Sequence, residues 1–180
     1  MSEKLFENGG SALIGNKLTD CQEMFRHACT FCECADIALD KFKHDTADIG
    51  FYVSPVTINS AFACEVFLKA ILMYQDKKIP RSHKLRDLYN ALPKELKKLI
   101  KREVSGGYPD RWTNIWGQDH LDNISNAFVE WRYNYEHDWR KDSSTMHIEV
   151  GFLNRFRNTS REICCRMFFG ITWDEYKEVR

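Results

Sequence analysis

The amino-acid sequence predicts an all-α fold, an up-and-down bundle of four to five main helices, from three observations. The segment 54–75 is apolar almost all round, and its only strongly polar side chains between Val56 and Met73 are Asn59, Glu65 and Lys69. The segment 17–43 carries apolar residues at helical spacing. No segment alternates between apolar and polar residues as a half-buried strand would, and no internal repeat is visible.

Length and composition fit one domain that spans residues 1–180. The chain is 43% apolar and 29% charged, which is enough to bury a sizeable core. Its formal net charge is zero, so overall charge does not favour non-specific binding to nucleic acids or membranes. The first residues lack the apolar core of a signal peptide, and segment 54–75 is too interrupted to span a bilayer comfortably. We therefore expect a cytoplasmic protein, outside membranes, with its seven cysteines as thiols.

The chain begins with residues 1–15, which we expect to form a flexible or docked arm because an Asn-Gly-Gly-Ser run interrupts it. The next segment, 17–43, is predicted to be one long bundle helix, and 44–52 a connection. The apolar seam of the helix steps by four and three through Cys21, Phe25, Ala28, Cys32, Ala35, Leu39 and Phe42.

Segment 54–75 must lie inside the bundle, because a helix that is apolar almost all round needs neighbours on every side. Pro55 is suited to its first turn, and Pro80 follows its end. Ser82 is then the predicted N-cap of a short helix with Leu85, Leu88 and Leu92.

Pro93 starts a further helix with one strongly basic side, formed by Lys94, Lys97, Lys98, Lys101 and Arg102. This side fits either a solvated face or a surface for RNA phosphates. Residues 104–118 form an aromatic loop, punctuated by Gly and Pro and carrying Tyr108, Trp112, Ile115 and Trp116. Such a loop either packs on the bundle or closes over a site or a partner.

Two more long helices are predicted in the last third of the chain. Asp119 is placed to cap the first, which extends to residue 136 or 138, and the second covers 146–169. Gly170 ends this last long helix, and residues 171–180 form a short amphipathic tail.

The cysteines do not have the spacing of a metal site. Cys29, Cys32 and Cys34 lie within one periodic helix, and no matching Cys or His pair at zinc spacing occurs elsewhere. We therefore interpret the cysteines as small buried apolar residues and expect no metal and no cofactor.

The two charges on the central helix need an explanation. Glu65 and Lys69 are four residues apart and can pair with each other. On so apolar a helix this pair must be compensated in the core, or must face a groove or an interface.

The segment 131–139 concentrates side chains that can bind or transfer protons, because Arg132, Tyr133, Glu136 and His137 lie within six residues. Arg132 and Glu136 are four apart, which also fits an ordinary helical ion pair. Arg132 and His137 are five apart, and they converge only if the helix ends or bulges between them or if two chains contribute. An arginine that holds a phosphate and a histidine that moves a proton suit RNA cleavage, in which the 2′-hydroxyl is the nucleophile and no metal is required.

These features together resemble the HEPN superfamily of helical bundles over roughly residues 17–169. The resemblance is carried by the apolar helix with Asn59, Glu65 and Lys69, by the His83-x-Leu-x-x-Leu segment after a proline, and by the late Arg132-x4-His137. The order of these elements is more specific than any one motif.

The resemblance implies a homodimer that cleaves RNA without metal, as a toxin or an anti-phage defence component. Arg132 would bind the scissile phosphate and His137 would be the general acid or base, with Asn59, Glu65, Lys69, Tyr133 and Glu136 in binding or supporting roles. Catalytic members often carry Asn, Asp or His directly after the arginine, whereas this chain has Tyr133. The alternative is therefore a non-catalytic module that binds a partner protein, such as an antitoxin, or a nucleotide.

Overall fold

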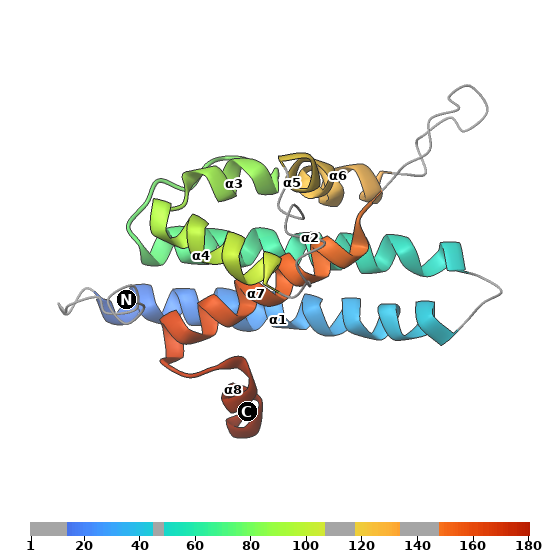
Figure 1. Ribbon diagram of the computed structural model, residues 1–180. Coiled ribbons are helices and arrows are strands. Elements are labelled where there is room, and N and C mark those ends of the chain that lie inside the picture. Colours follow the sequence, from blue (N-terminus) through green and yellow to red (C-terminus); the bar gives the residue numbers. More distant parts are fainter. Residues whose placement is uncertain (1–13, 45–48, 107–117, 134–147) are drawn as a thin grey trace.

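The computed structural model describes residues 14–44, 49–106, 118–133 and 148–180, and these residues form eight helices and no strand (Figure 1). The all-α prediction is thereby confirmed for the described residues. The helices are α1 (Ile14–His44), α2 (Ile49–Tyr74), α3 (Leu85–Ala91), α4 (Lys94–Ser105), α5 (Gln118–Ser125), α6 (Ala127–Arg132), α7 (Val150–Phe169) and α8 (Trp173–Val179).

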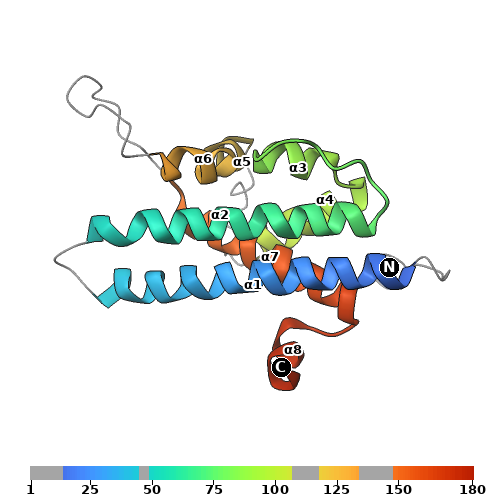
Figure 2. The ribbon, with the colours of Figure 1, turned by 180° about the vertical axis from the view of Figure 1, so that it is seen from behind.

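The long helices α1 and α2 lie side by side and antiparallel, and α7 crosses them obliquely (Figures 1 and 2). Helices α3, α5 and α6 lie along the side of α2 that faces away from α1, while α4 packs against α7. The C-terminal α8 folds back onto α1, where Tyr176 makes an edge contact with Phe25 at 5.2 Å between ring centroids. Helix α2 is therefore enclosed by α1, α3, α6 and α7.

The burial pattern of α2 confirms that it is the central helix. Most of its circumference is buried, including Val56, Ala61, Cys64, Leu68 and Ile71, and its remaining side is half-buried. By length and composition alone the segment Tyr52–Tyr74 could also cross a membrane, but two thirds of it (67%) is buried inside the bundle, and a core helix passes the same test.

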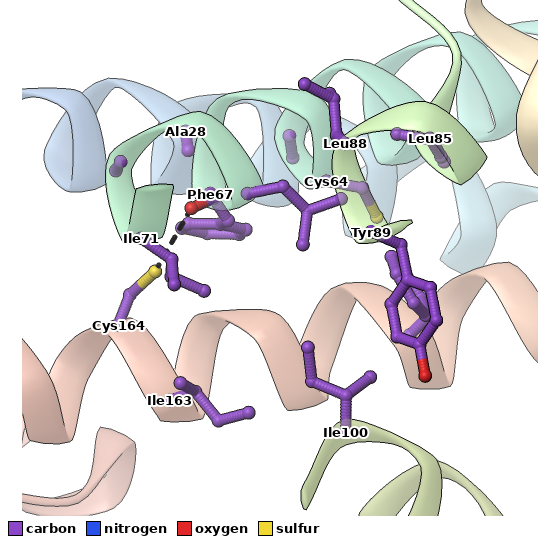
Figure 3. Close-up of a cluster of buried hydrophobic side chains, with 14 of the residues drawn as sticks. Ala28, Cys64, Phe67, Ile71, Leu85, Leu88, Tyr89, Ile100, Ile163 and Cys164 are labelled. Atoms are coloured by element: carbon purple, nitrogen blue, oxygen red, sulfur yellow. Dashed lines mark hydrogen bonds between the residues drawn. The ribbon is translucent and has the colours of Figure 1, made fainter. Parts of the chain in front are cut away.

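One part of the core lies between α2, α3, α4 and α7 (Figure 3). Phe67 and Ile71 of α2 meet Leu88 of α3, Ile100 of α4 and Ile163 of α7, all of them buried. Burying each such side chain contributes about 1.5–3 kcal/mol, so this cluster is a main source of stability.

The predicted seam of α1 also packs as expected, since Cys21, Phe25, Ala28, Cys32 and Ala35 are buried and Leu39 is half-buried. Most of these side chains are small, which allows α1 and α2 to approach each other closely. The Cys21 thiol accordingly reaches the backbone of α2, where its Sγ donates to the carbonyl of Ala70 at 3.6 Å.

Two predicted helix starts in the first half of the chain are wrong. Helix α2 begins at Ile49 rather than Ser54, so Pro55 lies inside the helix, and part of the predicted connection 44–52 is helical. Ser82 is not the N-cap of α3, because that position is held by Lys84 without a side-chain cap bond. Ser82 instead accepts a hydrogen bond from the Lys84 amide at 3.0 Å and donates to Asp87 at 2.7 Å, which shapes the turn before the helix.

The helices of the last third are shorter than predicted. In place of one long helix from Asp119, α5 and α6 are separated by a break at Asn126, whose backbone leaves helical values (φ −96°, ψ 4°). Helix α7 starts at Val150, after non-helical Ile148 and Glu149. Its predicted end is confirmed, because Gly170 adopts the left-handed conformation (φ 73°) that terminates helices. The bundle thus has three long helices, α1, α2 and α7, among the residues described.

Candidate functional site

Glu65 is the centre of a polar cluster on the central helix. Its side chain is almost completely buried, with the residue 2% exposed. The Lys69 Nζ lies 2.7 Å from Glu65 Oε1, one helical turn away, as the spacing predicted. The His83 Nδ1 lies 3.0 Å from Oε1 and 3.2 Å from Oε2 of the same carboxylate. A carboxylate removed from water needs such partners, because the cost of its desolvation is several kcal/mol.

His83 comes from the connection between α2 and α3, eighteen residues after Glu65. Sequence reasoning used this histidine only as part of the HEPN pattern and did not pair it with the carboxylate. We call Glu65, Lys69 and His83 the polar cluster. The three side chains differ sharply in solvent access: Glu65 is 3% exposed, Lys69 is 25% exposed and His83 is 61% exposed. The cluster therefore links a buried charge to an imidazole at the surface.

The hydrogen bond to Glu65 gives the two nitrogens of His83 different roles. When Nδ1 carries its proton, it donates to the carboxylate, and Nε2 is the nitrogen left to accept a proton from solvent or a ligand. A carboxylate that holds one imidazole nitrogen also fixes the orientation of the ring. The arrangement can thus exchange protons at a defined surface position.

Phe128 of α6 connects the polar cluster to Arg132. The His83 ring centroid lies 6.0 Å from that of Phe128, and the Arg132 Cζ lies 4.9 Å from the same centroid. Phe128 is itself stacked on Phe62 of α2 at 5.0 Å, which anchors α6 to the central helix. Arg132 and His83 therefore lie against one aromatic ring although they are 49 residues apart in the chain.

Arg132 is exposed at the last position of α6. Its guanidinium lies 4.5 Å from the Tyr133 ring centroid and donates a hydrogen bond to the Tyr133 hydroxyl. Stacking on Phe128 and Tyr133 restricts the side chain while its charge stays accessible to water. We call Glu65, Lys69, His83, Phe128, Arg132 and Tyr133 the candidate site; it combines two permanent cations, one carboxylate and one imidazole.

Not all predicted site residues belong to this group. Asn59 donates from its side-chain amide to the carbonyl of Pro55 at 2.8 Å, a bond within α2 that supports the helix around its internal proline. Glu136 and His137 lie outside the described residues, as do Trp112 and Trp116 of the aromatic loop. The structure thus brings together Glu65, Lys69, Arg132 and Tyr133 of the predicted set and adds His83 and Phe128.

The cysteines behave as core residues, with one exception. Six of the seven are buried, and only Cys34 is exposed, which corrects the prediction at that position. Burial raises the pKa of Cys29 to about 12 and those of Cys21, Cys32 and Cys165 to about 11. Thiols with raised pKa values are poor nucleophiles and metal ligands. Among the described residues, no group of three or more His, Cys, Asp or Glu is arranged to hold a metal ion.

A second buried charge, Arg157 of α7, was not anticipated from the sequence. Its residue is 2% exposed, and its guanidinium donates to Ser60 Oγ at 3.1 Å and forms an ion pair with Asp36 of α1. Asn154 adds a contact of 3.2 Å with the Ser60 hydroxyl. This network connects α1, α2 and α7 and stabilises their packing.

No family model, no curated protein and no solved structure matches this chain. The functional interpretation therefore depends on the residues of the candidate site and on the residue pattern of the sequence.

Proposed function

We propose that this protein is a metal-independent endoribonuclease of the HEPN type, acting as a cytoplasmic homodimer in a toxin or anti-phage defence role. In this proposal Arg132 binds the scissile phosphate and His137 serves as general acid or base. The observation that carries it is the position of Arg132: an exposed, stacked guanidinium that shares the Phe128 ring with His83. A second cation, Lys69, is held by the same polar cluster.

The chemistry needs only groups that this chain has. An arginine fork can bind two phosphate oxygens at once and stabilise the charge that develops on them. The nucleophile is the 2′-hydroxyl of the RNA, and an imidazole whose ordinary pKa lies near 6.5 can move its proton at neutral pH. Arg132 supplies the first function and His137, five residues further along the chain, the second.

The test is cleavage of purified, mixed RNA by the purified protein in EDTA, with single variants at both positions. We expect RNA to be cut by the wild type and to stay intact with Arg132→Ala and His137→Ala. Arg132→Lys keeps the charge but not the fork, and is expected to retain only a small part of the rate. Lys101→Ala on α4 and His44→Ala at the end of α1 remove one exposed cation and one exposed histidine elsewhere, and serve as matched controls.

Two results would contradict the proposal. One is intact RNA with a wild-type protein that is folded and dimeric by circular dichroism and light scattering. The other is cleavage that persists in both variants, which would indicate a contaminating nuclease.

One observation favours the second candidate, a non-catalytic HEPN-like module that binds a nucleotide or a partner protein such as an antitoxin. The Arg132 guanidinium already donates to the Tyr133 hydroxyl and stacks on Phe128, so part of its hydrogen-bonding capacity is used within the protein. Co-purification with the product of a neighbouring gene, without any loss of RNA, would support this alternative. If binding is unchanged in Arg132→Ala and Tyr133→Phe, the surface around Arg132 and Tyr133 is excluded as the contact.

A further inference from the structure

The proposed reaction needs two proton transfers. The 2′-hydroxyl must lose a proton as its oxygen attacks phosphorus, and the departing 5′-oxygen must gain one. A single imidazole can do both only in sequence, whereas two groups can do both in one step. The motif Arg132-x4-His137 provides one histidine per chain, so the second group is either the same histidine of the other chain of the proposed homodimer or another side chain of the candidate site.

The polar cluster contains a second imidazole with the properties of a general base. His83 is accessible, with 61% of its side chain exposed, and its Nδ1 lies within hydrogen-bonding distance of both oxygens of Glu65. The partner carboxylate is buried and is held in place by Lys69 at 2.7 Å. The ring is thus oriented from one side, and Nε2 is the ring nitrogen that Glu65 does not hold.

We propose that His83 is a further catalytic residue, the general base of the RNA cleavage, and that Glu65 is its positioning residue. The inference rests on the proposed function. His83 Nε2 takes the proton of the 2′-hydroxyl, and Glu65 stabilises the imidazolium that forms. His137 is then left as the general acid.

The step balances as a transphosphorylation. The 2′-oxygen forms a bond to phosphorus and the bond from phosphorus to the 5′-oxygen breaks, which gives a 2′,3′-cyclic phosphate and a 5′-hydroxyl. The proton from the 2′-hydroxyl goes to His83, and the 5′-oxygen receives a proton from His137. Exchange with water restores both histidines, and no oxidant, reductant or further reactant is needed.

Lys69 has a supporting part in this arrangement. A lone buried carboxylate would favour its protonated form, which could not stabilise an imidazolium. The Lys69 ammonium lies 2.7 Å from Glu65 Oε1 and supplies a compensating charge beside the buried carboxylate. Lys69 and Arg132 also leave the candidate site with one more positive than negative charge before His83 is protonated, which suits an anionic substrate.

A purely structural role makes different predictions. In that case the contact between His83 and Glu65 only fastens the connection between α2 and α3 to the central helix. Replacing His83 would then change stability, and would change cleavage only in proportion to the fraction of folded protein. The pH dependence of the rate would remain that of the wild type.

The experiment is the single-turnover cleavage rate of a short RNA, in EDTA, across pH 5–9. The wild-type rate should give a bell-shaped pH profile. It falls at low pH because the general base is protonated (the acid limb), and at high pH because the general acid is deprotonated (the alkaline limb). His83→Asn keeps a side-chain donor near Glu65 and should lower the rate about 100- to 10,000-fold. Its profile should lose the acid limb and keep the alkaline limb, whereas His137→Asn should do the reverse.

Glu65→Gln tests the positioning role, because it keeps the shape and an acceptor oxygen but removes the charge. The rate should fall, since the imidazolium that forms on His83 loses its counter-charge. If this buried variant does not fold, NMR of the wild-type protein replaces it: the midpoint of the His83 ring titration should coincide with the acid limb.

The outcomes separate the two proposals. A folded wild type that leaves RNA intact overturns both. Cleavage that depends on Arg132 and His137, with the acid limb unchanged in folded His83→Asn, overturns only the role of His83. A His83 titration midpoint far from the acid limb also overturns it. Loss of the acid limb in folded His83→Asn supports it.

Discussion

Raising the pH from 8 to 10 should destabilise this protein strongly, because it buries six thiols. Cys21, Cys32 and Cys165 have pKa values near 11 and Cys29 near 12, and burial also raises the pKa values of Cys64 and Cys164. The ordinary value is 9.0, so these thiols ionise in the unfolded chain first. A folded-state pKa that is raised gives stability that is complete below pH 9 and is lost as the pH rises.

The magnitude follows from linkage. A thiol that ionises with a pKa of 9.0 when unfolded and about 11 when folded costs the folded state about 1 kcal/mol between pH 8 and 10. Several such thiols together amount to several kcal/mol, a large part of the stability of a typical domain, which is about 5–15 kcal/mol. Tyr89 acts in the same direction, since burial raises its pKa to about 12.

Urea unfolding at each pH, in the presence of a phosphine reductant, measures this loss. The free energy of unfolding should fall steeply above pH 8.5, and Cys64→Ala should reduce the loss between pH 8 and 10 by about 1 kcal/mol. The matched control is Cys34→Ala, which removes an exposed thiol and should leave the loss unchanged. Equal pH dependence in the wild type and in Cys64→Ala would refute the reasoning.

Three further predictions concern the same fold. In the native protein, Ellman's reagent should label only Cys34 rapidly, and after denaturation it should label all seven thiols. Fast reaction of a second thiol in the native protein would contradict the burial of the other six cysteines. Arg157→Ala should cost about 1–3 kcal/mol in urea unfolding, because the buried guanidinium and its hydrogen bond to Ser60 are lost, whereas the exposed Asp36 is solvated by water. A cost near zero would contradict its stabilising role. Gly170→Ala should lower the free energy of unfolding by about 1–2 kcal/mol, because an alanine is strained at φ 73°. Gly151→Ala, with open space around the new methyl group, should raise it by about 0.5 kcal/mol. Changes of the same sign in both variants would refute the backbone argument.

The parts of the fold that sequence reasoning predicted correctly are those with local signals. The central helix follows from its apolar residues, the α1 seam from its spacing, and the end of α7 from Gly170. The errors in the fold lie at helix starts and at one break within a predicted helix. Pro55 lacks an N–H, and helices tolerate that loss near their beginning, so its position favours but does not determine where α2 starts. The break at Asn126 has no proline or glycine to mark it.

The candidate site was predictable only where its residues are neighbours in the sequence. Glu65 and Lys69 are neighbours on one helix, so their pairing follows from spacing alone. The contact between His83 and Glu65 depends on how the connection after α2 folds back along it, and the proximity of Arg132 depends on the packing of α6 on Phe62 through Phe128. No pattern in one sequence encodes these tertiary contacts.

The two buried charges of the core differ in what they do: Arg157 stabilises the packing of helices, whereas Glu65 belongs to the candidate site. Burying Arg157 and burying Glu65 both cost desolvation energy, and both are compensated by ion pairs from other parts of the chain. The partner of Arg157 is Asp36, a group that keeps its charge at all pH values near neutral, so the pair has only one state under these conditions. Glu65 has two partners: Lys69, one turn along the same helix, and His83, whose imidazole is the one side chain that ordinarily changes its charge between pH 5 and 8. A buried carboxylate with such a partner at the surface has two states that differ by one proton, and only that arrangement can take a proton from a substrate and return it to water.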